Sequence, residues 1–529
     1  MSYRWLAAGA AALVLAACAG KSTDGGGNPP DAGVVLENVP PGQPDGGAPD
    51  GGAPDAGPPA VTTTPPVTKD HWTFYGTGQG LSGNVWDVSA DEGGNVYVAG
   101  FDGLYAKRKA DAAFTRFDGA NSDITKNCYD TGADPDPNGG SNYRLFAPTI
   151  VALDHPDPPG PAILCPVVSV AGLADGAAAI GFQGLGTDGD YDADWATDSG
   201  GADVVRFDAA AGKLTRTRHV FFATPPHFIC GVIGAEAFGV TSCPDVTDPI
   251  WAGGRRKLRT VFRLVANHDT SSPMYGDLWA GGTHATFAAL LNNAAQRGWH
   301  DITAGQADPK WAAAKDVWEH DHPGILSPDG NNFLTGYTYA MSIDPRNGRI
   351  WASNGVRTAF LAGYGPDLSD RGWFSAPTDV PGHPWYDIWP DSGDFLNGPT
   401  NDGVKSMSHC PDGTLWIGSE NHGLARIGPG GGVSGFVDLP NGSGAEAVAC
   451  DPTDRSIWIG LGAGGVLRLK NGAFTKLDTT GLPDFANQPV MSIQIDRWTS
   501  PRTVYVAYAA TRQGGKVIRA GGVAAYDGP

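Results

Sequence analysis

The sequence is 529 residues long and combines 77 glycines and 42 prolines with a formal net charge of -20. This negative charge excludes nucleic-acid binding through a basic surface as the function of the chain, and it disfavours contact with an anionic membrane surface. With 16 tryptophans, 15 tyrosines and only 36 lysines and arginines, the composition is typical of many short strands joined by tight turns.

The first twenty residues have the pattern of a secretory signal. Arg4 supplies a positive charge, and an apolar run over residues 6–17 leads to Cys18. The run is too short to span a bilayer as a mature helix. The residues LAAC at 15–18 resemble the lipobox of bacterial lipoproteins, which implies cleavage after residue 17 and lipidation of the Cys18 thiol. Lipid chains contribute roughly 0.8 kcal/mol per buried CH₂ and would hold the chain on a membrane.

The residue after Cys18 is Ala19, and the resemblance to enteric lipoproteins then implies the outer membrane, with the chain facing the periplasm or the cell surface. The alternative is an ordinary cleaved signal with a chance cysteine. The Gly/Pro/Asp-rich stretch that follows cannot bury enough apolar surface to become ordered. We therefore expect a signal peptide over residues 1–17, a lipidated and disordered linker over 18–70, and a folded domain over 71–529.

Short aromatic strands recur along the folded part. Each follows an alternating strand and an Asp/Gly/Pro turn, as VWDVSAD (85–91) precedes GGNVYVAG (93–100). Third and fourth strands follow in most units, for example GLYAKRK (103–109) and AFTRFDG (113–119), and GWHDIT (298–303) is a further predicted fourth strand. Four antiparallel strands in about 40 to 50 residues indicate one blade of a β-propeller. The prediction is an all-β, seven-bladed propeller whose blades begin near Val85, Val167, Thr260, Thr338, Val404, Ala445 and Val490.

The seventh unit stops after its third strand, GVAAY (522–526). The missing fourth strand matches HWTFYG (71–76), which precedes the first blade. Pairing of these two segments would close the ring and remove an exposed sheet edge. The alternative, a leading loop at 71–76, leaves the last blade one strand short.

Residues 80–106, GLSGNVWDVSADEGGNVYVAGFDGLYA, resemble the two-component regulator propeller repeat, and residues 404–426 are nearly as close to it. This repeat occurs in bacterial sensor ectodomains and in exported propellers, so the resemblance implies the fold. Because no kinase segment or transmembrane helix accompanies the repeat, a signalling function does not carry over.

Long connections are predicted mainly between second and third strands and between blades. Since these two classes share one face of the disc, we expect that face to carry the loops and the binding surface, and we expect the linker to leave from the opposite face. The long connections are 119–149, 184–201, 224–259, 304–335 and 363–401.

Two of these connections contain candidate metal ligands. The alternating carboxylates of an acidic loop suit Ca²⁺, although Ala193 and Ser199 depart from a calcium-loop pattern; the alternative is a solvated acidic loop. His320 and His322 form a second candidate, with simple exposure as the alternative, after a short helix predicted over 308–318. The candidate calcium ligands are Asp188, Asp190, Asp192, Asp194 and Asp198.

Six of the seven cysteines remain once Cys18 is assigned to lipid. An even count in an exported chain indicates disulfides, but six cysteines allow fifteen connectivities. Proximity favours Cys230 with Cys243, and repeat alignment favours Cys410 with Cys450. The remaining pair would be Cys128 with Cys165.

Aromatic residues divide into two groups. Trp279, Trp351, Trp416 and Trp458 share one repeat position and are expected between blades, in the core. Those in the loops are free to bind, above all Trp385, Tyr386 and Trp389, which suit a sugar or a peptide.

No hydrolase, zinc-protease or phosphate-loop motif is present, and no catalytic residue or further cofactor is assigned. The sequence therefore predicts a monomeric, membrane-anchored binding or adaptor module with a protein or glycan partner. The alternative is a propeller enzyme that is glycan-active or lyase-like. TLWIGSENHGLARIG (414–428) resembles the streptogramin lyase repeat, which implies Glu420 with His409 or His422 as acid–base groups.

Overall fold

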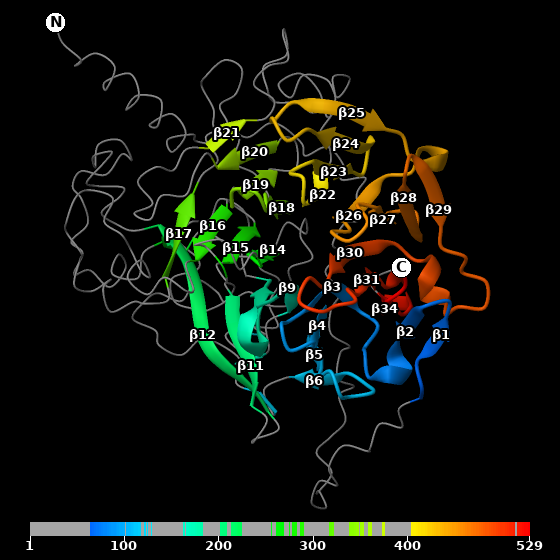
Figure 1. The fold of residues 1–529 in the computed structure, drawn as a ribbon. Coiled ribbons are helices and arrows are strands. Elements are labelled where there is room, and N and C mark those ends of the chain that lie inside the picture. Colours follow the sequence, from blue (N-terminus) through cyan, green and yellow to red (C-terminus); the bar gives the residue numbers. More distant parts are fainter. Residues whose placement is uncertain are drawn as a thin grey trace, which may run out of the picture.

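A computed structural model describes residues 64–100, 102–117, 404–513 and 516–529, and between 118 and 403 it describes mainly strands and adjoining turns. The described residues are all-β, with short 3-10 helices and no α-helix. The sheets stand around a common centre, which confirms the predicted β-propeller (Figure 1). In the same residues, no helix has the length and apolarity needed to cross a membrane.

Four sheets contain four consecutive strands in simple antiparallel order. The first consists of β3 (Val85–Ala90), β4 (Val96–Gly100), β5 (Gly103–Lys107) and β6 (Thr115–Phe117). The second consists of β18 (Ala340–Ile343), β19 (Ile350–Ser353), β20 (Thr358–Leu361) and β21 (Trp373–Ser375). The third consists of β22 (Val404–His409), β23 (Leu415–Ser419), β24 (Gly423–Ile427) and β25 (Val433–Val437). The fourth consists of β26 (Ala445–Cys450), β27 (Ile457–Leu461), β28 (Val466–Lys470) and β29 (Ala473–Lys476).

Two further groups of four strands are joined in one nine-stranded sheet. One group contains β9 (Val167–Gly172), β10 (Ala177–Phe182), β11 (Ala202–Asp208) and β12 (Lys213–Thr224). The other contains β14 (Val261–Ala266), β15 (Leu278–Gly282), β16 (Thr286–Ala289) and β17 (Val317–Asp321). The outermost strands β12 and β17 run parallel and pair through Phe221 and Phe222, and β13 (Arg255–Arg256) pairs with the end of β12. Because of this junction, the count of seven blades stays a prediction.

Strand β17 corrects two expectations. Val317 and Trp318, predicted as the end of a helix, begin a strand that pairs with β16 and takes the place of a fourth strand. The segment 298–303, predicted for that role, lies outside the described residues. Residues 308–316 of the predicted helix lie outside the described residues, and the pairing of β17 with two neighbouring strands outweighs a local helix preference at Val317 and Trp318.

The first strands of the units surround the centre (Figure 1). Each contacts the first strand of the next unit, and the last one, β30 (Val490–Ile495), contacts β3, so the circle is complete. Apolar clusters fill the wedges between neighbouring sheets. Trp279, Trp351 and Trp458 are buried there as predicted, while Trp416 is half-buried against the same kind of cluster.

The closing sheet has five strands and unites the two ends of the domain. It contains β1 (Val67–Lys69), β2 (Trp72–Tyr75), β34 (Gly522–Tyr526), β31 (Val504–Tyr508) and β30. Trp72 pairs with Tyr526 and Tyr75 pairs with Val523, which confirms the predicted closure. Strand β1 falls inside the segment predicted as linker and adds a strand that was not expected.

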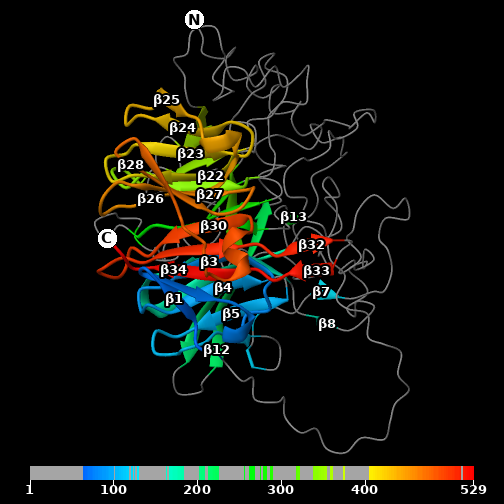
Figure 2. The ribbon, with the colours of Figure 1, turned by 90° about the vertical axis from the view of Figure 1, so that its right-hand side faces the viewer.

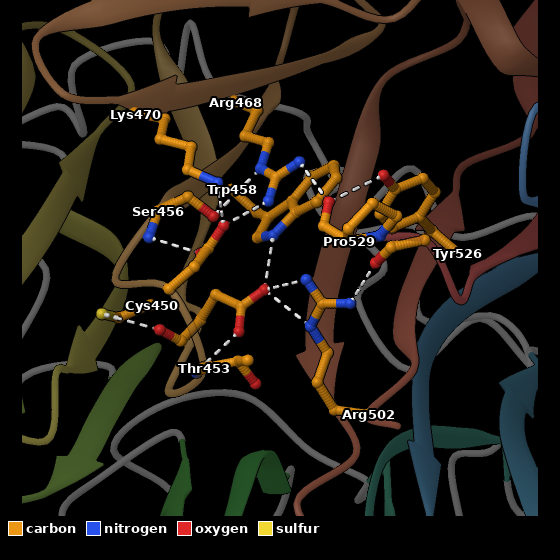
Figure 3. A network of polar contacts seen from close by, with 12 residues as sticks. Cys450, Thr453, Ser456, Trp458, Arg468, Lys470, Arg502, Tyr526 and Pro529 are labelled. Carbon is orange, nitrogen blue, oxygen red and sulfur yellow. Dashed lines mark hydrogen bonds and ion pairs between the residues drawn. The ribbon is translucent and has the colours of Figure 1, made fainter. Parts of the chain in front are cut away.

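Aromatic and ionic contacts hold this closing sheet to its neighbour. The Trp72 ring lies 4.9 Å from the Tyr526 ring and 5.9 Å from the Trp458 ring, measured between centroids. The Arg468 guanidinium donates to the Pro529 backbone oxygen at 2.9 Å and to Asp454 at 2.5 Å (Figure 3). These contacts hold the C-terminal end of the chain and strand β2 against β27 and β28 of the neighbouring sheet.

The chain reaches this sheet from an unexpected direction. Strand β1 runs antiparallel to β2, so Val67 lies opposite Phe74, and the Thr64 backbone N–H donates to Gly78 at 2.9 Å. Gly78 belongs to the connection between the last and the first blade, on the face predicted to carry the loops. The expectation that the linker leaves from the opposite face is therefore wrong, because the unforeseen β1 reverses the chain.

One predicted disulfide is confirmed. Cys410 directly follows β22, Cys450 is the last residue of β26 in the adjacent blade, and their Cα atoms lie 5.3 Å apart across a disulfide bond. The bond joins the end of β22 to the end of β26 and therefore ties two blades together.

The closing strand yields a stability prediction. Phe74 is fully buried and packs against Phe485, so Phe74→Ala should lower the free energy of unfolding by about 3 to 5 kcal/mol. Val67→Ala, on the exposed side of β1, should change it by no more than about 0.5 kcal/mol. Urea denaturation of both variants measures the difference, and equal effects would contradict the role given to β2.

Candidate functional site at the loop face and central channel

The two faces of the disc differ. We call the face with second-to-third and blade-to-blade connections the loop face, and the face with first-to-second connections the turn face. All described strands outside the blades lie on the loop face, and the C-terminal end lies on the other side (Figure 2). These strands are β7 (Cys128–Tyr129), β8 (Ala162–Ile163), β13, β32 (Thr511–Gln513) and β33 (Lys516–Arg519).

The predicted one-sided distribution of long connections holds only in part. Residues 290–316 connect β16 to β17, and residues 362–372 connect β20 to β21. Both connect a third strand to a fourth and therefore begin and end at the turn face. The predicted loops 304–335 and 363–401 had been assigned wholly to the loop face because β17 and β21 were not recognised.

An ionic cluster lies where β22, β23 and β26 meet the loop face. Lys405 is the second residue of β22, Glu420 follows β23, and Glu446 is the second residue of β26. The Lys405 Nζ lies 3.4 Å from Glu420 Oε2 and 4.8 Å from the centre of the Tyr339 ring. The cluster therefore places two carboxyl groups around one ammonium group.

Burial changes the chemistry of one of these carboxyl groups. The pKa of Glu446 is raised to about 7. Desolvation by burial is the main cause, the nearby Lys405 ammonium opposes it, and the Glu420 carboxylate adds to it. A Cβ atom added at Gly462 would lie 2.8 Å from Glu446 Oε1, so the backbone packs closely on this group. A carboxyl group with a pKa near neutrality can donate or accept a proton under ordinary conditions.

The lyase-like pairing of Glu420 with His409 is not formed. His409 pairs with Leu415 at the turn-face end of the β22–β23 hairpin, whereas Glu420 follows Ser419 at the loop-face end. The His409 ring contacts Ser342 Oγ at 2.9 Å, and burial lowers its pKa to about 3. His422 remains on the side of Glu420, where its backbone N–H donates to Ser419 Oγ at 2.9 Å.

The first strands enclose a central cavity of about 130 Å³. Polar side chains from one blade accept hydrogen bonds from the backbone N–H groups of the next, which links the blades around the cavity. The pairs are Asp87 to Val170 at 3.1 Å, Ser89 to Gly172 at 2.9 Å, Ser342 to His409 at 3.0 Å, Ser406 to Val448 at 3.0 Å and Ser408 to Cys450 at 3.0 Å.

A buried ion pair lies beside this cavity and includes one of its lining residues, Arg263. Arg263 Nη1 lies 3.7 Å from Asp87 Oδ1, and the two side chains are 13% and 3% exposed. Desolvation raises the pKa of Asp87, whereas Arg263 and the hydrogen bonds to Ser492 and Val170 lower it. The pair joins the first and third units across the second, a structural role that repeat alignment does not predict.

Most of the predicted binding residues lie outside the described residues. These are Cys18, the calcium candidates Asp188, Asp190, Asp192, Asp194 and Asp198, the aromatic candidates Trp385, Tyr386 and Trp389, His322, and the cysteines Cys165, Cys230 and Cys243. Cys128 lies in β7, and His320 lies in β17. Among the residues that are described, no group of three or more His, Cys, Asp or Glu side chains is arranged to hold a metal ion.

Sequence reasoning missed Lys405, Glu446 and the Asp87–Arg263 pair. The only signal in the sequence is a charged residue at a position where the repeat otherwise favours apolar or small side chains, as in AEAVAC (445–450) and VFRLVA (261–266). A charged residue at such a position indicates a side chain in an unusual environment, but the sequence does not show which residue it contacts.

The Glu446 environment predicts a pH dependence of stability. The folded chain keeps the Glu446 proton at pH values where the unfolded chain has lost it, so the free energy of unfolding should fall as the pH rises from about 4.5 to about 7. Glu446→Gln should reduce this fall by about 2 kcal/mol. Urea denaturation across this pH range measures it, with the exposed Asp484→Asn as control; an unchanged slope in Glu446→Gln would contradict the assignment.

Of the known proteins compared with this chain, only solved structures are similar to it. No family model matches the sequence, and no curated protein matches it either. The extracellular domain of the putative hybrid two component system BT3049 from B. thetaiotaomicron is similar at 12% identity and a TM-score of 0.43, over 87% of this chain and 42% of that chain. YCF48 bound to D1 peptide is similar at 11% identity and a TM-score of 0.40, over 87% and 98% of the two chains. Virginiamycin B lyase from Staphylococcus aureus is similar at 10% identity and a TM-score of 0.38, over 85% and 96%.

Proposed function

We propose that this chain is an extracytoplasmic lipoprotein, anchored in the outer membrane through Cys18, that binds a protein or glycan partner through the loop face of its propeller. One observation carries the proposal: every described strand outside the blades stands on the loop face (Figure 2). Segments added to a rigid scaffold commonly carry the binding function, because the scaffold holds them in place without constraining their sequence.

Exposed apolar side chains on this face support the proposal. Val517 and Ile518 in β33 are 43% and 53% exposed, although the propeller offers ample buried positions for such residues. Exposed branched apolar side chains on a binding face contribute to affinity when a partner covers them. The sequence adds Trp385, Tyr386 and Trp389 to a connection that ends at the same face.

A second candidate function is an enzyme acting on glycans. The observation in its favour is the Glu420–Glu446 pair beside Lys405, in which burial raises the pKa of Glu446 to about 7. Pairs of carboxyl groups with separated pKa values serve as general acid and base in glycoside hydrolysis. Turnover of a captured glycan, lost in Glu446→Gln, would favour this function over binding alone.

Capture of partners from isolated membranes tests the binding face. The purified chain carrying both Val517→Ser and Ile518→Ser should retain several-fold less of the partner that the unmodified chain retains, because the substitutions remove apolar contact area. Arg455→Ser on the turn face, a similarly exposed site, serves as the matched control. Loss of capture in the Arg455 variant, with retention in the Val517 and Ile518 variant, would place the binding surface on the turn face instead.

Membrane anchoring has a separate test. Cys18→Ala removes the thiol that would carry the lipid, so the chain should move from the membrane fraction to the soluble fraction and incorporate no labelled fatty acid. The unmodified chain, expressed and fractionated in parallel, provides the reference. A Cys18→Ala chain that stays with the membrane at the same level would exclude lipid anchoring at this residue.

A further inference from the structure

The central cavity has a charge opposite to that of the chain as a whole. The full sequence has 56 acidic and 36 basic residues, yet the described residues that line the cavity include two arginines and a histidine and no aspartate or glutamate. The lining residues of basic type are Arg263, which pairs with Asp87, Arg497, and His268, whose ring is neutral, so Arg497 supplies the positive charge. The cavity is therefore suited to an anionic ligand, which the surrounding surface would otherwise repel.

Arg497 is the cation at the turn-face end of this cavity. It follows Asp496 in the connection from β30 to β31, and its side chain is exposed. Within the described part of the chain, its guanidinium makes no hydrogen bond and no ion pair, whereas Arg263 is paired with Asp87 and Arg502 with Asp451. An arginine at a cavity mouth that makes no direct hydrogen bond can offer its donors to a ligand.

The nearby carboxylates are already engaged. Asp451 stabilises the charge of Arg497, but its Oδ2 accepts from Arg502 Nε at 2.7 Å and its Oδ1 accepts from the Thr453 N–H at 2.9 Å (Figure 3). Asp496 accepts from Thr499 Oγ1 at 2.6 Å and from the Trp498 N–H at 2.8 Å. Neither group is therefore free to pair with the Arg497 guanidinium.

Neutral hydrogen-bond donors surround the same end of the cavity. Gln494 lines it, is half-buried, and has no side-chain hydrogen bond among the described residues. The Ser408 hydroxyl accepts from the Cys450 N–H, which leaves its own proton free to donate into the cavity. These groups supply hydrogen bonds to an oxyanion without adding charge.

His268 also lines the cavity, and the Trp498 ring packs against it. Their ring centroids lie 4.1 Å apart, and the His268 Nε2 contacts the Gly172 carbonyl oxygen at 3.0 Å. Burial and the nearby Arg497 lower the pKa of His268 to about 4, so this ring is neutral. The Trp498 Nε1 atom is buried without a hydrogen-bond partner in the described residues, a donor that a ligand or a water molecule would satisfy.

We propose that the turn-face end of the central cavity binds a small organic carboxylate, with Arg497 as its counter-charge and Gln494 and Ser408 as further donors. A guanidinium matches the two oxygens of a carboxylate in a bidentate arrangement, and a single unpaired cation matches its single charge. A cavity of about 150 Å³ accepts benzene, so the 130 Å³ found here suits a ligand of roughly six non-hydrogen atoms. This site lies on the face opposite to the proposed partner surface and is independent of that proposal.

Calorimetric titration of the purified full chain with lactate tests the site, with lactamide as the uncharged probe of the same size. Lactate should bind in the millimolar range or tighter, and lactamide should bind at least tenfold more weakly, because a charge-assisted hydrogen bond is lost. Arg497→Gln should weaken lactate binding at least tenfold, while Arg108→Gln, which alters an exposed arginine paired with Asp111, should leave it unchanged.

Thermal unfolding of the Arg497→Gln chain controls for folding and should match that of the unmodified chain, since this side chain makes no structural hydrogen bond in the described residues. The proposal is overturned if lactate does not bind at millimolar concentration, if lactamide binds equally well, or if Arg497→Gln binds lactate as the unmodified chain does.

Discussion

The pairing of β2 with β34 is the constraint on which the rest of the molecule depends. It joins residues 72–75 to residues 523–526 and so makes a circle from sheets that follow one another along the chain. Each sheet buries its apolar faces against two neighbours, so an open ring would leave two faces and one strand edge exposed to water. Trp72, Trp458 and Tyr526 pack together at this seam and make the closure a packed core as well as a ladder of hydrogen bonds.

Side chains on the inner side of the ring hold neighbouring blades together. Ser89, Ser406 and Ser408 accept backbone hydrogen bonds from the next blade, which fixes the spacing of the first strands. Buried polar groups of this kind are favourable because they are hydrogen-bonded within the protein. The charges left over from this arrangement, Arg497 at the turn face and Glu446 near the loop face, stand out for that reason.

Local sequence patterns predicted those parts of the fold that repeat. Alternating strands, Asp/Gly turns and a recurrent tryptophan identified the hairpins, and alignment of the units placed Cys410 beside Cys450. The closure followed from the shortage of one strand in the last unit. Strands β1 and β17 escaped detection because VTK and VWEHD are too short for a periodic signal, and their pairing partners decide their conformation.

The candidate site was less accessible from sequence for a related reason. Glu420 and Glu446 come from different sheets, and Asp87 and Arg263 are separated by a whole unit. A pKa near 7 at Glu446 arises from burial between sheets, which no single segment encodes. Sequence reasoning could place Glu420 and His409 only as neighbours along the chain, and the length of the β22–β23 hairpin separates them in space.

The short strand β1 determines how the domain would respond to force. A pull on the chain ahead of residue 64 acts at the end of β1 that lies farthest from its turn with β2, so the pairs from Val67 to Lys69 would open one after another. Unzipping of this kind loads a single pair at a time and yields at low force. β1 would thus detach as a short tether extension while the β2–β34 seam, and with it the ring, stayed intact.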